Sequence, residues 1–120
     1  MIRVYTAPGS QSCRKVIAWL KEHNLSFIEK NIFSSDLHAN ELREILERCE
    51  NGTDDILSKN SKRIKSNKID FDNRKMDELI AFIKANPSIL KRPILMDEHR
   101  FQVGYNEEEI RTFIPRHQRG

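Results

Sequence analysis

The chain begins with a short β-rich run that stops at a proline-glycine pair. Ile2, Val4 and Tyr5 predict a strand, and Pro8-Gly9 predicts a turn directly after it. Four apolar positions then recur at i, i+3, i+4 and i+7, the spacing of one face of a helix. This stripe consists of Cys13, Val16, Ile17 and Leu20. We therefore expect a strand, a turn and a helix that ends near His23-Asn24 and buries its first cysteine.

The next segment returns to strand character. Leu25 to Ile32, with Phe27 and Ile28, predicts a second strand. A helix between two strands at this connection length forms a right-handed βαβ unit, so the two strands should be parallel.

The middle of the chain, about residues 36–90, is predicted to be helical. One stripe with helical spacing consists of Leu42, Ile45, Leu46 and Cys49. We expect its helix to end at Asn51-Gly52, because glycine readily adopts the left-handed conformation of a helix end. A later stripe, ended by Asn86-Pro87, consists of Met76, Leu79, Ile80 and Ile83.

Between these helices, Thr53-Asp54-Asp55 predicts the capped start of a short helix that carries Ile56 and Leu57. Five basic residues crowd the stretch that follows: Lys59, Lys62, Arg63, Lys65 and Lys68. The run is typical of a solvated loop or helix face, and a cationic patch that faces an acidic protein or a phosphate backbone is the alternative.

The last third predicts a hairpin and a final helix. Residues 93–96 and 101–104 read as antiparallel strands joined by a polar turn. Asn106 and Glu109 resemble a capping box at the start of a helix that Pro115 ends. The inner face of this helix would consist of Ile110, Phe113 and Ile114.

The predicted order is thus β-α-β, a helical block and β-β-α, which is an α/β thioredoxin-like arrangement with a central helical insertion. In that arrangement a proline that opens the third strand, here Pro93, often follows a cis peptide bond. The length of 120 residues fits a single domain over residues 1–120.

Composition narrows the function classes. The chain is 38% hydrophobic and 32% charged, and no apolar run approaches the roughly 18–20 residues that cross a bilayer. The N-terminus enters a strand without a signal peptide, and Cys13 and Cys49 are too few for a disulfide framework, so we expect a cytoplasmic protein. The four histidines lack ligand spacing, and we predict neither a metal site nor a cofactor.

The turn before the first helix is the natural place for chemistry. A helix N-terminus stabilises thiolates and oxyanions, and a thiol-disulfide protein would carry Cys-x-x-Cys there. Here the motif runs from Ser10 to Cys13, and a serine hydroxyl neither ionises near neutral pH nor forms a disulfide. The ordinary dithiol cycle is therefore absent, and Cys13 is either an inert core residue or a thiol that forms mixed disulfides.

Several segments match one known family in register: Ser12–Lys15 with Ala18–Leu20, Asn31–Ser34, Glu50–Ile56, Arg92–Ile94, and Gln102–Glu107 continuing to Pro115-Arg116. Together they resemble the Spx branch of the arsenate reductase (ArsC/Spx) family from Tyr5 to Arg116.

The resemblance implies a transcriptional regulator rather than an enzyme. Members bind the C-terminal domain of the RNA polymerase α subunit and act under thiol and oxidative stress. Promoter DNA within the polymerase complex and a proteolytic adaptor are further partners that the resemblance implies. The family's polymerase contact centres on the position of Gly52, and we expect Glu47, Arg48 and Asn51 beside it. The alternative is that Gly52 is only a helix C-cap.

Departures from the family pattern concern the same sites. The first cysteine of the family's redox pair, which is also the nucleophile of arsenate reductases, falls at Ser10, so only the Cys13 position is retained. Position 47, usually basic, is Glu47. In the family an arginine at the position of Arg92 lies near the cysteine turn and binds an oxyanion or stabilises a thiolate; here it could only pair with a carboxylate or an anion.

Three hypotheses follow. The first is a regulator that binds RNA polymerase, and the second is an ArsC-type arsenate reductase that uses Cys13 as its nucleophile. The third is a thioredoxin-like binding module that has lost both roles.

Overall fold

The computed structural model describes four ranges of the chain: residues 1–34, 37–49, 55–57 and 75–113. Contacts divide the chain into two compact units, residues 1–31 with 92–120 and residues 32–91. Each unit contains its own set of buried apolar side chains. Within the described ranges, no helix combines the length and the apolar character needed to cross a membrane.

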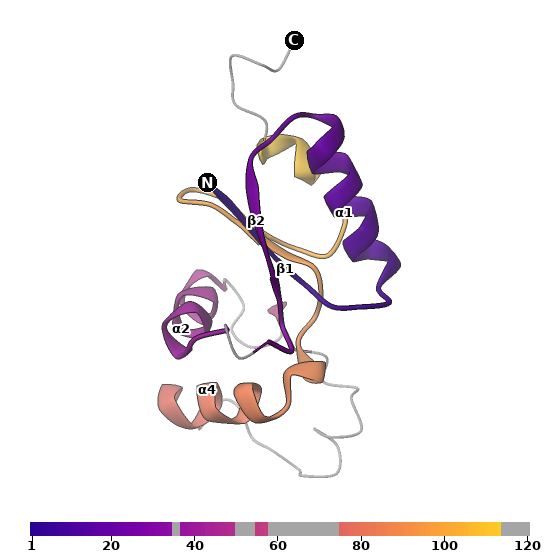
Figure 1. The fold of residues 1–120 in the computed structure, drawn as a ribbon. Helices are drawn as coiled ribbons and strands as arrows, with labels where there is room; N and C mark the ends of the chain where they lie inside the picture. The colour runs from indigo at the N-terminus through magenta and orange to yellow at the C-terminus, as the bar shows by residue number, and fades with distance from the viewer. Residues whose placement is uncertain (35–36, 50–54, 58–74, 114–120) are drawn as a thin grey trace. The chain divides into compact units, whose positions relative to one another are not determined.

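The first unit is built on a four-stranded sheet with the order β2-β1-β3-β4 (Figure 1). Its strands are β1 Ile2–Thr6, β2 Phe27–Asn31, β3 Ile94–Met96 and β4 Phe101–Val103. β1 and β2 are parallel and are connected through helix α1, Gln11–Glu22, whereas β3 is antiparallel to both β1 and β4. The predicted βαβ unit and hairpin are confirmed, although the second strand is shorter than predicted.

Helix α1 packs on one face of this sheet. Val16 and Leu20 on the inner side of the helix are fully buried with Val4 and Leu95, which are cross-strand partners on β1 and β3. Burying one aliphatic side chain of this kind contributes about 1.5–3 kcal/mol. This packing fixes the position of α1, and therefore of the turn that precedes it.

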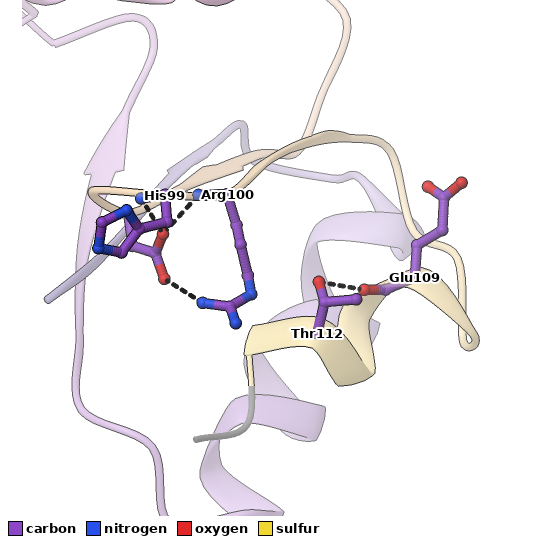
Figure 2. A network of polar contacts seen from close by, with 5 residues as sticks. His99, Arg100, Glu109 and Thr112 are labelled. Carbon is purple, nitrogen blue, oxygen red and sulfur yellow. Dashed lines mark hydrogen bonds and ion pairs between the residues drawn. The ribbon is translucent and has the colours of Figure 1, made fainter. Parts of the chain in front are cut away.

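The carboxylate of Asp97 stabilises the turn between β3 and β4. Asp97 Oδ1 accepts hydrogen bonds from the backbone N–H groups of His99 at 2.8 Å and Arg100 at 2.7 Å. The other carboxylate oxygen lies 3.8 Å from Arg100 Nη1 (Figure 2). The polar residues between the two strands thus form the predicted tight connection.

The final helix begins as predicted but has a different geometry. Asn106 Oδ1 accepts hydrogen bonds from the N–H groups of Glu108 and Glu109, at 2.9 and 3.1 Å. The segment Glu109–Phe113 is a 3₁₀ helix, η3, rather than the α-helix that we expected. Short segments favour this tighter form, and the Thr112 hydroxyl reinforces it by donating to the Glu109 carbonyl at 2.8 Å (Figure 2).

The second unit contains α2, Ala39–Arg48, and α4, Met76–Ala85, which pack against each other and are followed by η2, Pro87–Ile89. Arg43 Nη2 lies 2.7 Å from Asp77 Oδ1 across the two helices. The buried side chains are those of the predicted stripes: Leu42, Ile45 and Leu46 on α2, and Leu79, Ile80 and Ile83 on α4.

The predicted end of α2 was wrong. The helix ends at Arg48 rather than at Asn51-Gly52, because Cys49 has an extended backbone with φ −72° and ψ 126°. The Cys49 thiol donates to the Ile45 carbonyl at 3.3 Å, so a carbonyl of the last turn is satisfied without a glycine.

Of the predicted short helix, Asp55 has 3₁₀-helical conformation and positions 53–54 lie outside the described residues, whereas Ile56 and Leu57 are not helical as we expected. Leu57 forms an isolated antiparallel bridge with Leu90, and the Lys91 N–H donates to the Ile56 carbonyl at 2.7 Å. The predictions for positions 51–54, 59–68 and 114–115 lie outside the described residues.

Candidate functional site

The turn between β1 and α1 is a helix cap. Gly9 has a φ of +78°, in the left-handed region that favours glycine. Ser10 is the N-cap of α1, with φ −87° and ψ 120°, and its Oγ accepts a hydrogen bond from the Cys13 N–H at 3.3 Å. Ser10 therefore satisfies one of the N–H groups that the start of a helix leaves without a backbone partner.

Cys13 is the first inward residue of α1, as the stripe predicts. The residue is only 4% exposed, so its thiol has little access to a bulky reagent or substrate. With a hydroxyl at Ser10, the turn holds one sulfur atom where thiol-disulfide exchange needs two. The local geometry can cap a helix and offers no dithiol cycle.

Arg92 precedes β3 at the edge of the same unit. The Arg92–Pro93 peptide bond is cis, as predicted for Pro93. Pro93 is buried, and its carbonyl accepts a hydrogen bond from the Gly104 N–H at 2.7 Å, which ties this segment to the end of β4. Arg92 itself is partly buried, and its role beside the turn stays a prediction.

The residues predicted to contact a partner occur at the end of α2 and just beyond it. Glu47 is exposed and Arg48 is partly buried, whereas Asn51 and Gly52 lie outside the described residues. The exposed side of α2 carries Arg43 and Glu47, one helical turn apart. Its buried side consists of Leu42, Ile45 and Leu46.

Cys49 is held as a neutral thiol. Burial raises the pKa of Cys49 from 9.0 to about 11, and the nearby carboxylate of Asp55 contributes in the same direction. Because the thiolate is the reactive form, this thiol is a poor nucleophile at neutral pH.

The histidines are not gathered for metal binding in the described ranges, where no group of three or more His, Cys, Asp or Glu side chains could hold an ion. His23 stacks on Trp19 at a centroid distance of 4.0 Å and an interplanar angle of 25°. Its Nδ1 also lies 2.8 Å from the Trp19 carbonyl oxygen. His23 thus belongs to the C-terminal end of α1.

A groove beside α1 was not predicted. It has a volume of about 700 Å³, and its walls are the turn at residues 6–10, one side of α1 and the strand β2. The helical wall presents Arg14, Ala18 and Lys21 at i, i+4 and i+7. The stripe that carries Arg14 and Lys21 was the only sequence signal that could have indicated this groove. The sequence does not show, however, that the packing of α1 beside β2 places the stripe opposite Glu29.

Because the pKa of Cys49 is raised by its surroundings, the rate of its alkylation tests the burial of Cys49 in the second unit. At pH 8 a pKa of 11 instead of 9 lowers the thiolate fraction about 100-fold. We expect iodoacetamide to alkylate Cys49 in the native protein correspondingly more slowly than in urea, as followed by peptide mass spectrometry. Asp55→Asn should accelerate the native reaction, because it removes a negative charge that disfavours the thiolate. Equal rates in the folded and unfolded chains would contradict the assigned environment.

Comparison with known proteins places this geometry in a family. The ArsC family model matches residues 5–113. The chain is 50% identical to the global transcriptional regulator Spx 1 of Oceanobacillus iheyensis over 116 residues, which are 97% of this chain and 88% of the relative. It is 48% identical to the global transcriptional regulator Spx of Listeria innocua over the same shares of both chains.

Solved structures agree on the fold. A protein described as a possible arsenate reductase from Streptococcus mutans superposes with a TM-score of 0.74 and 21% identity, covering 92% of this chain and 97% of that one. At this identity the likeness establishes the α/β thioredoxin-like fold alone. From the match over residues 5–113 and the identity to Spx proteins along nearly the whole sequence, the chain belongs to the ArsC family, in its Spx branch.

Proposed function

We propose that this chain is a cytoplasmic transcriptional regulator that binds the C-terminal domain of the RNA polymerase α subunit and acts under thiol and oxidative stress. The observation that carries the proposal is the 50% identity, over 97% of the chain, to a protein named global transcriptional regulator Spx 1. Promoter DNA is contacted within the polymerase complex, and a proteolytic adaptor is a further partner.

The polymerase contact is assigned to the end of α2 and the residues after it. Glu47 and Arg48 lie at the C-terminal end of a helix whose opposite side is buried, so the helix offers a rigid surface. We include Asn51 and Gly52 in this surface from the family resemblance. A glycine there allows a partner's backbone to approach closely.

The regulator is proposed to lack the dithiol switch of its family. Ser10 stands where the family has the first cysteine, and its Oγ accepts a hydrogen bond from the Cys13 N–H. Since a serine forms no disulfide, oxidants would not change the covalent state of this turn through a local pair. Thiol stress would then regulate the protein by acting on its partners or by changing its concentration in the cell.

Arsenate reduction is not part of the proposal. The reaction needs a thiolate nucleophile at an accessible helix terminus, and the position is occupied by the non-ionised hydroxyl of Ser10. The only thiol of this turn, Cys13, is 4% exposed. No specific observation favours the third hypothesis, a binding module without a regulatory role.

Gly52→Arg tests the polymerase contact. The large cationic side chain would hold a closely approaching partner away, so we expect binding to the isolated polymerase α C-terminal domain to weaken at least about tenfold, a loss of about 1.4 kcal/mol. Isothermal titration calorimetry measures the change. Glu98→Arg, at an exposed position in the β3–β4 turn, is the control with a similar new side chain. Unchanged affinity in the Gly52 variant would remove the proposed interface.

Ser10→Cys tests the missing switch. Residues three apart at a helix start bring their Cα atoms to about 5–6 Å, which a disulfide can span. We expect the variant to lose two titratable thiols after diamide and to regain them after dithiothreitol. Ser12→Cys adds the same thiol at a neighbouring position and should not form this reversible pair with Cys13. If the thiols of the Ser10 variant stay reduced under excess oxidant, the assigned geometry of the turn is wrong.

A further inference from the structure

The groove beside α1 carries two cations on one wall. Arg14 and Lys21 lie two helical turns apart, with the small residue Ala18 between them, and all three are exposed. Ala18 leaves room between the two longer side chains. Seven residues of α-helix rise by about 10 Å, which sets the separation of the two charged positions.

The rest of the groove is partly apolar. Ile17 packs against the core of the first unit and also lines the groove, and Ala7 is only 5% exposed. A ligand in this groove would therefore contact an apolar floor between two positive charges. This combination suits a segment with alternating acidic and aliphatic character better than a bare inorganic anion.

The acidic residue of the groove does not neutralise the two cations. Glu29 Oε2 accepts a hydrogen bond from the Thr6 hydroxyl at 2.8 Å, which holds this carboxylate on the β2 side. Within the described part of the chain, neither Arg14 nor Lys21 forms an ion pair or a side-chain hydrogen bond. The lining thus has two cationic side chains and one carboxylate, and both charged residues of its helical wall are cationic.

We propose that this groove binds an extended acidic segment of a partner protein. Two carboxylates four residues apart in an extended chain point to the same side and are separated by about 13 Å, and the side chain midway between them points to that side as well. The long side chains of Arg14 and Lys21, about 10 Å apart along the helix, can span this separation. The aliphatic residue between them packs over Ala18 and Ile17. Charge-assisted hydrogen bonds to the two cations provide the selectivity for acidic side chains.

The inference goes beyond the proposed polymerase contact and does not rest on it. All residues of the groove belong to the first unit, whereas Glu47 and Gly52 belong to the second. Arg92 and Pro93 do not line the groove, so the proposed contacts to Arg14 and Lys21 do not involve Arg92.

The probe is the capped peptide acetyl-Gly-Glu-Ala-Val-Ala-Glu-Gly-amide, in which the two glutamates and the valine share one face of the extended chain, titrated into ¹⁵N-labelled protein and followed by chemical-shift changes. We expect shifts at the groove residues, an affinity that falls as salt is added, and binding at least about fivefold weaker for the isosteric peptide with glutamine in place of glutamate. Equal binding of the two peptides would overturn the proposal.

Matched charge reversals on α1 locate the site. Arg14→Glu and Lys21→Glu should each weaken the acidic peptide at least about fivefold, because they replace attraction with repulsion. Lys15→Glu changes the net charge equally at an adjacent exposed position that does not line the groove, and should change the affinity less than about twofold. All three positions are exposed, so circular dichroism should show an unchanged fold.

Two results would contradict the proposal. If the Lys15 and Arg14 variants lost equal peptide affinity, the binding would be a non-specific electrostatic attraction to the helix and not recognition by the groove. The second contradicting result is a concentration-dependent dimer that Glu108→Lys abolishes. It would mean that the groove binds the exposed acidic residues Glu107–Glu109 of a second copy of the chain. Ultracentrifugation separates this case, and we expect the sedimentation coefficient to be independent of concentration.

Discussion

Burial of Val16 and Leu20 between α1 and the sheet is the interaction on which the geometry of the first unit depends. It fixes the axis of the helix, and the helix in turn fixes three different surfaces. The inward stripe holds Cys13 in the core, the first turn is capped by Ser10, and the side next to β2 lines the groove. A single packed element therefore determines where the buried cysteine, the cap and the groove lie.

The cap at Ser10 stabilises the start of α1 without a thiol at this position. Serine is among the best N-cap residues, since its oxygen accepts a hydrogen bond from a backbone N–H that would otherwise have no partner. The turn keeps its shape because Gly9 and the cap define it. The shape of this turn therefore does not depend on a thiol at position 10.

The sequence was sufficient where burial and periodicity coincide. The stripes through Val16 and through Ile45 predicted α1 and α2, and two short strand-like runs joined by a polar turn predicted the β3–β4 hairpin. The sequence was not sufficient to predict where the helices end. Cys49 continues the apolar spacing but leaves the helix, because its thiol bonds to the Ile45 carbonyl instead.

The candidate site, too, could be predicted from the sequence only in part. Ser10 and Cys13 are neighbours on a capped turn, so local rules placed them correctly. The groove was missed because Arg14 and Glu29 come together only when α1 packs beside β2. Gly52 could be singled out from the family resemblance alone, and its surroundings lie outside the described residues.

We infer that the N-terminus of α1 is a structural cap and that Cys13, buried beside it, takes no part in sulfur exchange. The most direct measurement is the oxidation state of Cys13 in the native, unmodified protein after incubation with oxidised glutathione, read by mass spectrometry of the intact chain and its peptides. We expect Cys13 to remain a reduced thiol in the folded protein and to form a mixed disulfide only after unfolding. Rapid and stoichiometric modification of Cys13 in the folded protein would contradict it.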